Sequence, residues 1–154
     1  MYTKGDFHIH STYSDGSLTP SQIINLAKKR DMDIISITDH NNTSGIDEAI
    51  IAGKKNNVTV IPGLELSTRY NGCRVHVLGY FKDDSYKNDL LKEVLLKVKQ
   101  QRIKDIRKMF EDKIDFCGFK NKLCVQTGVD ILRLFGAVVV LAHPVLLCKK
   151  DFKD

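Results

Sequence analysis

The chain has 154 residues, 42% of them hydrophobic and 28% charged, with a formal net charge of +5. This length suits one domain with a real core, which excludes a disordered chain and a disulfide-stapled miniprotein. The mild positive charge fits an anionic small substrate or a weak nucleic-acid contact.

Several sequence patterns concern location. No apolar run reaches the ~18–20 residues of a membrane span, and residues 1–10 lack the pattern of a secretory signal. We therefore expect a cytoplasmic protein without a membrane partner. The four cysteines, which form no CxxC pair, are expected to be free thiols: Cys73, Cys117, Cys124 and Cys148. The basic residues of segment 92–113 are typical of a solvated helix face, so a nucleic-acid partner is not favoured.

Strand and helix patterns alternate along the first 80 residues. Thr19-Pro20-Ser21-Gln22 indicates a helix start, with Thr19 as N-cap and Gln22 completing a capping box. Asn71-Gly72 is a hairpin signal. The expected elements, in chain order, are strand 6–10, helix 20–30, strand 33–38, helix 44–56 (capped by Thr43 or Ser44), strand 58–61, strands 64–69 and 74–81 around the hairpin turn, helix 85–112, helix 127–135 and buried strand 136–142.

This alternation, with nearly continuous apolar strands, predicts an α/β fold with a parallel sheet or barrel. In such folds, the chemistry collects at the carboxyl ends of the strands.

The first motif with candidate metal-ligating residues is Asp6-Phe7-His8-Ile9-His10. Residues i and i+2 of a strand point to the same face, so His8 and His10 would project side by side. This geometry lets two imidazoles bind one metal ion, and Asp6 could orient one of them. The alternative is two exposed strand histidines.

Three acidic residues and one histidine follow at turns or strand ends. Asp15 lies in the turn-rich Ser14-Asp15-Gly16, where an aspartate is also common without a ligand. The apolar strand 33–38 stops abruptly in Asp39-His40, which is typical either of a ligand position or of a helix-cap or turn cluster. Glu65 lies between two leucines after a further strand, where it either is buried against a partner or a metal, or faces solvent.

The remaining histidines are His76, flanked by valines, and His143, which ends the apolar strand 136–142 before Pro144. A lone histidine such as His76 is often a core residue. Taken together, however, all five histidines fall in or beside predicted strands, mostly at strand ends, which favours one shared site. Imidazole and carboxylate without thiolate suit Zn²⁺, Mn²⁺ or Fe²⁺.

These motifs, in this order, resemble those of the PHP (polymerase and histidinol phosphatase) family. The resemblance covers residues 1–81 and 127–145 and is weak between them. It rests on Asp6-x-His8-x-His10, Ser14-Asp15-Gly16, Ile37-Thr38-Asp39-His40, Pro62-Gly63-x-Glu65, His76-x-Leu78-Gly79-Tyr80 and Ala142-His143-Pro144.

The resemblance implies a single domain over residues 1–154 with a distorted (β/α)₇ TIM-like barrel and two or three divalent metals. It implies that His8 and His10 hold a first metal, that Glu65 bridges it to a second metal, and that His76 and His143 complete the second. Asp15 and His40 would hold a third. Asp39 would act as a proton acceptor or orient a ligand. Within the family, the motifs are most similar to those of stand-alone phosphoesterases.

The chain also departs from the family pattern. The family adds two strands after Ala-His-Pro, the last ending in Asp-x-His, whereas this chain ends at Asp154. We therefore expect about five of the seven strands, with open edges through which the domain could form an oligomer. Residues 82–126 correspond to a helical insertion, here shortened.

The expected function is hydrolysis of a phosphate ester, in a nucleotide or small phosphomonoester, by a metal-activated hydroxide. The alternative is an inactive or metal-binding remnant that lacks the last barrel strands. A third interpretation keeps the metal site but cleaves another bond, as in exonucleolytic, histidinol-phosphate or amide hydrolysis.

Overall fold

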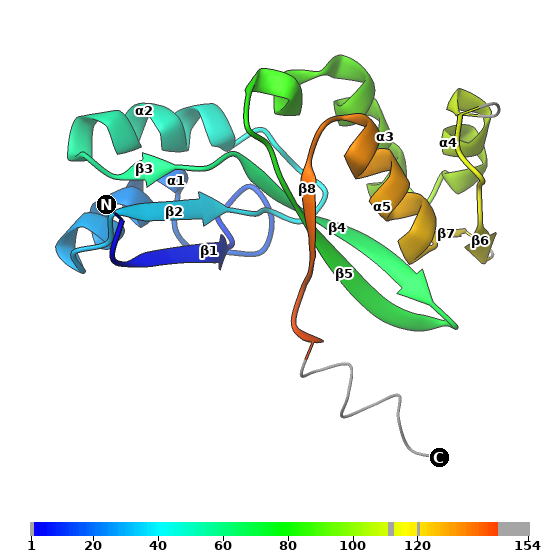
Figure 1. Ribbon diagram of the computed structural model, residues 1–154, viewed down its shortest axis with the longest axis horizontal. Coiled ribbons are helices and arrows are strands. Elements are labelled where there is room, and N and C mark those ends of the chain that lie inside the picture. Colours follow the sequence, from blue (N-terminus) through cyan, green and yellow to red (C-terminus); the bar gives the residue numbers. More distant parts are fainter. Residues whose placement is uncertain (1, 111–112, 120, 145–154) are drawn as a thin grey trace, which may run out of the picture.

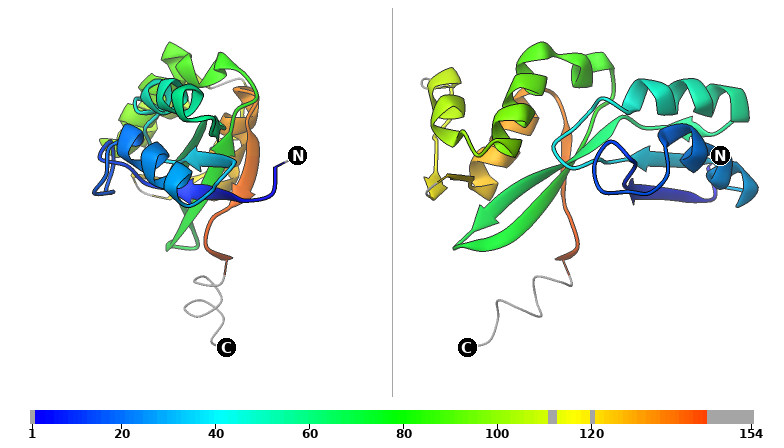
Figure 2. Two further views of the ribbon diagram at one scale, coloured as in Figure 1. Left: turned by 90° about the vertical axis from the view of Figure 1, so that its left-hand side faces the viewer. Right: turned by 180° about the vertical axis from the view of Figure 1, so that it is seen from behind.

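The computed structural model describes residues 2–110, 113–119 and 121–144 (Figure 1). Its N-terminal half contains a parallel sheet in the order β1-β2-β3, formed by β1 (Gly5–Ile9), β2 (Ile34–Ile37) and β3 (Thr59–Val60). Two helices, α1 (Pro20–Lys29) and α2 (Ile46–Asn56), pack against each other beside this sheet (Figure 2). The alternation of strand and helix predicted for this half is therefore confirmed.

The two helices begin in different ways. Thr19 caps α1, and the capping box with Gln22 is present, as the sequence predicts. The expected cap of α2 by Thr43 or Ser44 is wrong, because the helix begins after Gly45 without a side-chain cap. Instead, Asp47 and Glu48 lie in the first turn, where negative charge favours the helix dipole.

A second sheet has antiparallel neighbours in the order β4-β5-β8. Strands β4 (Gly63–Tyr70) and β5 (Cys73–Tyr80) form the predicted hairpin, in which Tyr70 pairs with Cys73. Both turn residues have positive φ, 46° at Asn71 and 83° at Gly72, which suits a two-residue hairpin loop. Strand β8 (Val138–Leu141) pairs with β5. The parallel arrangement expected from the sequence thus holds only for the first sheet.

The two sheets join at the carboxyl end of β2. A parallel β-bridge links His40 to Glu65 of β4. Here the amide of Asn41 donates to the carbonyl of Glu65 at 2.8 Å, and the amide of Glu65 donates to the carbonyl of Asp39 at 3.2 Å. The described strands form an open α/β arrangement and do not close into a barrel. The incomplete seven-stranded barrel remains a prediction.

The single helix expected over residues 85–112 is wrong. The segment contains a 3₁₀ helix η1 (Asp84–Lys87), then α3 (Asp89–Lys99) and α4 (Ile103–Met109), and residues 111–112 lie outside the described part. Asn88 starts α3 by accepting the amides of Leu90 and Leu91. Gln101, with φ of 58°, turns the chain between α3 and α4. A left-handed residue cannot continue a right-handed helix.

The segment that follows forms a small hairpin of β6 (Gly118–Phe119) and β7 (Lys122–Leu123), and then α5 (Val125–Leu134). A disulfide joins Cys117 to Cys124, so the expectation of free thiols is wrong for this pair. The hairpin brings their Cα atoms to 5.8 Å, a separation that a disulfide spans. Cys148 lies outside the described residues.

Two hydrophobic clusters form the core. One unites β2 with α1 and α2, and includes Ile24, Ile35 and Ala49. The other unites the second sheet with α3, α4 and α5, and includes Leu64 and Leu91. The division of the chain into a single domain with a shortened insertion over 82–126 stays a prediction.

Strand β8 is not buried as expected. Val138, Val140 and Leu141 are 49%, 46% and 44% exposed, because β8 is the last described strand of its sheet and no described strand covers its outer side.

Candidate metal centre

Glu65 is the centre of the candidate site. Its side chain is fully buried, at 0% exposure, where β4 meets the end of β2. The alternative in which Glu65 faces solvent is therefore wrong. A carboxylate removed from water in this way requires hydrogen bonds, cations or metal ions around it.

All five histidines surround this carboxylate. His8 lies in β1 and His10 directly follows it, and their ring centroids lie 5.2 Å apart, so the two rings project side by side. His40 follows β2, His76 lies in the middle of β5, and His143 follows β8. Four elements and the loops after them thus converge on one point, which the sequence motifs predicted.

The distances are short on both carboxylate oxygens. From Oε2, they are 3.1 Å to His8 Nε2, 2.9 Å to His10 Nε2 and 3.4 Å to His40 Nδ1. From Oε1, they are 2.9 Å to His76 Nδ1 and 2.7 Å to His143 Nε2. His40 Nδ1 lies within ion-pair distance of Glu65 but forms no hydrogen bond with it, so this buried nitrogen has no hydrogen-bond partner.

The protonation of this cluster is uneven. Burial acts to raise the pKa of Glu65, but hydrogen bonds from His10, His76 and His8 outweigh it and hold the pKa well below its usual range. The hydrogen bond to Glu65 raises the pKa of His10, against the opposing effect of burial. Burial lowers the pKa of both His40 and His143. The latter two rings therefore favour the neutral state, in which a nitrogen lone pair is available to a metal.

The donor set fits a pair of divalent metal ions. Five imidazole rings gather around the two oxygens of one carboxylate, and the buried Nδ1 of His40 has no hydrogen-bond partner. Two groups have ligand atoms within 4.8 Å of one another and share one carboxylate, namely His8, Glu65 and His143, and His10, His40 and Glu65. This grouping differs from the one that the resemblance implies, in which His8 and His10 share a metal.

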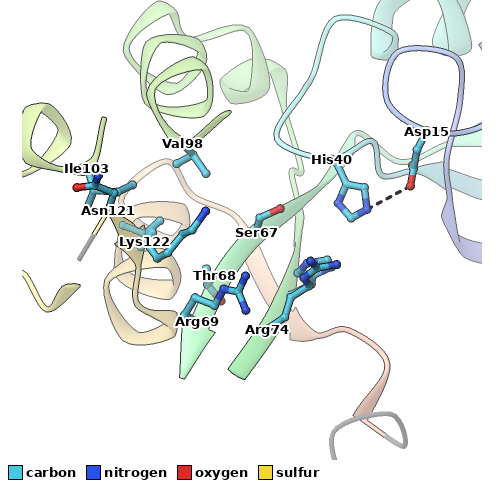
Figure 3. A pocket seen from close by; sticks show the side chains of 12 residues that line it. Asp15, His40, Ser67, Thr68, Arg69, Arg74, Val98, Ile103, Asn121 and Lys122 are labelled. Atoms are coloured by element: carbon cyan, nitrogen blue, oxygen red, sulfur yellow. Dashed lines mark ion pairs between the residues drawn. The ribbon is translucent and has the colours of Figure 1, made fainter. Parts of the chain in front are cut away.

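Asp15 lies at the open side of the cluster. Its side chain is 66% exposed, with Oδ1 at 2.7 Å from His10 Nδ1 and Oδ2 at 3.7 Å from His40 Nε2 (Figure 3). Burial acts to raise the pKa of Asp15 and is the largest single effect, but the hydrogen bond from His10 and the neighbouring charges of His40 and His10 together outweigh it and lower the pKa. Asp15 therefore orients His10 and stands beside His40, next to the two groups.

Asp39 is buried and turned toward the loop after β1. Its carboxylate accepts from the amide of Ser11 at 2.8 Å, the hydroxyl of Ser11 at 2.6 Å and the hydroxyl of Ser14 at 2.5 Å. Both oxygens are thus engaged with the segment that leads to Asp15. These contacts favour the expected role of orienting a ligand over that of a proton acceptor.

A cavity of about 370 Å³ adjoins the histidines on the side of Asp15 (Figure 3). Beside Asp15, His40 and His76, it is lined by residues that the motifs did not indicate: Ser67, Thr68, Arg69, Arg74, Val98, Ile103, Asn121, Lys122 and Leu123. The signal for part of this set was present, because Glu65, Ser67 and Arg69 alternate along one strand and so share a face.

Comparison with known proteins identifies the family. The model of the PHP domain matches residues 6–139. This chain belongs to the PHP domain family. The resemblance inferred from the motifs is confirmed.

Relatives of this PHP domain have named activities. The chain is 33% identical over 122 residues to a 5'-3' exoribonuclease of Haemophilus influenzae, an alignment that covers 79% of this chain and 43% of the relative. It is 32% identical over 104 residues to a 3',5'-nucleoside bisphosphate phosphatase of Chromobacterium violaceum, covering 68% and 36%. The PHP domain thus spans less than half the length of these two relatives.

Solved structures support the same fold. An amidohydrolase from Chromobacterium violaceum aligns with a TM-score of 0.60 at 30% identity, over 71% of this chain and 38% of the other. A metal-dependent phosphoesterase from Bifidobacterium adolescentis aligns with a TM-score of 0.67 at 20% identity, over 91% and 67%. Within the described residues, no helix has the length and apolar character needed to cross a membrane.

Proposed function

We propose that this PHP domain hydrolyses phosphate esters, in nucleotides or small phosphorylated molecules, with the help of divalent metal ions. The observation that carries the proposal is the convergence of five histidines on the buried carboxylate of Glu65, beside a cavity that is open to a substrate. Relatives named as a phosphatase, a phosphodiesterase and exoribonucleases support cleavage of phosphoester bonds.

We propose the following assignment of ligands. His8 and His143 hold one ion, His10 and His40 hold a second, and Glu65 is shared between them. His76 donates to the same carboxylate at 2.9 Å and fixes its orientation or joins the ligands. A neutral imidazole offers one nitrogen lone pair, so His40 serves either this second ion or, together with Asp15, a third ion in its place. Imidazole and carboxylate ligands suit Zn²⁺, Mn²⁺ or Fe²⁺.

Bound ions supply an acidified water molecule and neutralise charge on the phosphate oxygens. The protein's own residues do the rest. The hairpin β4–β5 fixes Glu65 and His76, the main-chain bridge to His40 fixes the second sheet against the first, and Asp39 holds the loop that carries Asp15. A site held on strands in this way is already arranged before substrate binds, which limits the cost of reorganisation.

The proposal is tested by metal analysis and by hydrolysis of a chromogenic phosphomonoester with added Mn²⁺. We expect bound metal and metal-stimulated turnover in the parent protein. Glu65→Gln keeps the shape of the side chain but removes the charge, and should lower both metal content and rate, the rate by more than about 100-fold. Glu93→Gln, at an exposed residue on α3, is the matched control.

Two results would contradict the proposal. Metal-free protein without metal-stimulated turnover would exclude it, as would turnover that Glu65→Gln leaves unchanged. Bound metal without turnover on a panel of phosphate esters would support the non-catalytic, metal-binding module instead.

A further inference from the structure

His40 is the least restrained ring of the histidine cluster. Each of the other four rings has a hydrogen bond to a carboxylate. The ring of His40 lies 3.4 Å from Glu65 Oε2 through Nδ1 and 3.7 Å from Asp15 Oδ2 through Nε2, and neither contact is a hydrogen bond. The place of this ring therefore depends on how its main chain is held.

Strand β4 holds the main chain at His40 through a short parallel ladder. The amide of Glu65 donates to the carbonyl of Asp39 at 3.2 Å, and the amide of Asn41 donates to the carbonyl of Glu65 at 2.8 Å. Because such bonds recur evenly along a parallel ladder, the next one would run from the amide of Ser67 to the main-chain carbonyl of Asn41. The chain leaves the strand at this residue, however, because Asn41 has a φ of 47°.

The side chain of Asn41 replaces the missing part of the ladder. Its Oδ1 accepts from the amide of Ser67 at 2.9 Å, and its Nδ2 donates to the hydroxyl of Ser67 at 2.9 Å. A side-chain amide has the same kinds of donor and acceptor as a peptide unit. Asparagine also tolerates a left-handed φ better than most residues do. Asn41 thus turns the main chain away from β4 and still continues the ladder.

This pair of residues lies where the rings of the two sheets meet. Asn41 directly follows His40, and Ser67 lies opposite His76 in the register of the β4–β5 hairpin. The ring centroid of His40 lies 4.5 Å from that of His10 and 4.9 Å from that of His76. The side chains of His40 and Ser67 both line the cavity (Figure 3). A change in the turn at Asn41 would therefore move His40 relative to rings of both sheets.

We propose that Asn41 is a positioning residue of the metal centre, which holds His40 in place as a ligand by pairing its side chain with Ser67. The proposal rests on the proposed function for the role of His40 as a ligand. A metal ligand has to be held within about 0.5 Å of its productive place. Since the ring of His40 has no hydrogen bond to Glu65 or Asp15, the residue next to it supplies this restraint.

Three variants separate the side chain of Asn41 from its backbone. Asn41→Gly removes the pair with Ser67 without adding strain, because glycine adopts a left-handed φ freely. Asn57→Gly is the matched control, at an exposed asparagine with a φ of 55° that ends α2 outside the site. Asn41→Asp keeps the pair, because a carboxylate accepts from both the amide and the hydroxyl of Ser67.

Two measurements report on His40 without turnover. In the metal-free protein, nuclear Overhauser effects from the ring of His40 to those of His10 and His76 report its place. We expect them in the parent, Asn57→Gly and Asn41→Asp, and we expect their loss in Asn41→Gly. In calorimetry, the affinity for Mn²⁺ should fall by about tenfold or more in Asn41→Gly and stay at the parent value in Asn57→Gly.

The outcomes distinguish this role from the proposed function. If the parent shows no turnover but the ring contacts and the Mn²⁺ affinity change as expected, the proposed function fails and the positioning role stands. Unchanged ring contacts in Asn41→Gly would overturn the role, as would an equal loss in Asn41→Asp, because the side-chain pair would then not be the cause. If Asn41→Gly does not fold, Ser67→Ala decides, since it removes the hydroxyl and leaves the main chain intact. Weaker ring contacts in Ser67→Ala support the role, and unchanged contacts overturn it.

Discussion

Asp39 lies next to His40 of the histidine cluster and is hydrogen-bonded to the loop after β1. Its buried carboxylate receives three hydrogen bonds from Ser11 and Ser14, and so ties the end of β2 to the loop after β1. Hydrogen bonds to a buried charge are worth more than neutral ones. The loop carries Asp15, so Asp39 positions that side chain beside His10.

Replacing Asp39 with asparagine should therefore act first on stability. We expect Asp39→Asn to lower the free energy of unfolding by about 1.5–3 kcal/mol, because the amide retains the shape but not the charge that the two serines bind. Urea unfolding measures this change. Asp130→Asn is the control, at a partly exposed residue of α5 that accepts from the side chain of Gln126, its one hydrogen-bond partner in the described part of the chain, and it should cost less than about 0.5 kcal/mol. A loss of turnover at unchanged stability would instead indicate that Asp39 accepts a proton in the reaction.

At the scale of elements, Tyr86 and Lys87 of η1 both contact Asp47 of α2. Tyr86 is 2% exposed, and its hydroxyl donates to Asp47 Oδ1 at 2.7 Å. Burial, together with this hydrogen bond to Asp47, raises the pKa of Tyr86 to about 12. The folded chain thus keeps the tyrosine protonated at a pH where the unfolded chain ionises it.

This shift predicts a loss of stability in alkali. The contribution of Tyr86 to the free energy of unfolding is fully present below the unfolded pKa of about 10. It declines as the pH rises toward 12, because ionisation of the tyrosine then stabilises the unfolded state. The decline between pH 9 and pH 12 should be at most about 2–3 kcal/mol. Urea unfolding of Tyr86→Phe should show a smaller decline than the parent over this interval. Tyr70→Phe, at a tyrosine that is 60% exposed, should match the parent.

The break between α3 and α4 gives a second prediction at this scale. Gln101 has a φ of 58°, which costs an L-residue with a side chain about 1 kcal/mol, whereas Gln100 has a φ of −79° at the end of α3. Glycine has no such cost. We expect Gln101→Gly to be neutral or to stabilise the protein by up to about 1 kcal/mol, and Gln100→Gly to destabilise it by about 0.5–1 kcal/mol. Thermal unfolding measures both changes, and an equal loss of stability in the two variants would contradict the left-handed turn at Gln101.

The sequence predicted one helix over this segment because nothing in its pattern marks the break. The apolar spacing of residues 91–110 continues through the turn, and glutamine is not typical of a left-handed position. A pattern of burial therefore indicates which residues face the core, but it does not reveal a backbone turn that keeps them there. The same limit applies to β8. Its apolar sequence predicts a buried strand, but β8 lies at the edge of its sheet, and Val138 and Val140 are about half exposed.

For the whole molecule, the histidine cluster could be predicted and the cation-lined cavity could not. His10, His40 and His143 follow β1, β2 and β8, so their convergence agrees with the rule that chemistry collects at strand ends. His76 lies in the middle of β5, and its place in the cluster depends on the register of the β4–β5 hairpin. Lys122 comes from a small hairpin with weak propensities, and its approach to Arg69 depends on the bridge to Cys124. Such long-range contacts have no local pattern in the sequence. The grouping of histidines around Glu65 likewise required the three-dimensional arrangement.

The position of the cluster at the junction of the two sheets has a consequence for folding cooperativity. Each sheet has its own hydrophobic cluster, while His8 belongs to the first sheet, His10 directly follows it, and Glu65 and His76 belong to the second sheet. An ion shared by these side chains binds only when both halves are folded, so its binding free energy links their unfolding. In calorimetry, the ratio of calorimetric to van't Hoff enthalpy should lie above one without metal and approach one with Mn²⁺. In Glu65→Gln, added Mn²⁺ should leave that ratio unchanged. A metal-free parent that already melts in one transition would show that the main-chain bridge at His40 suffices to couple the two halves.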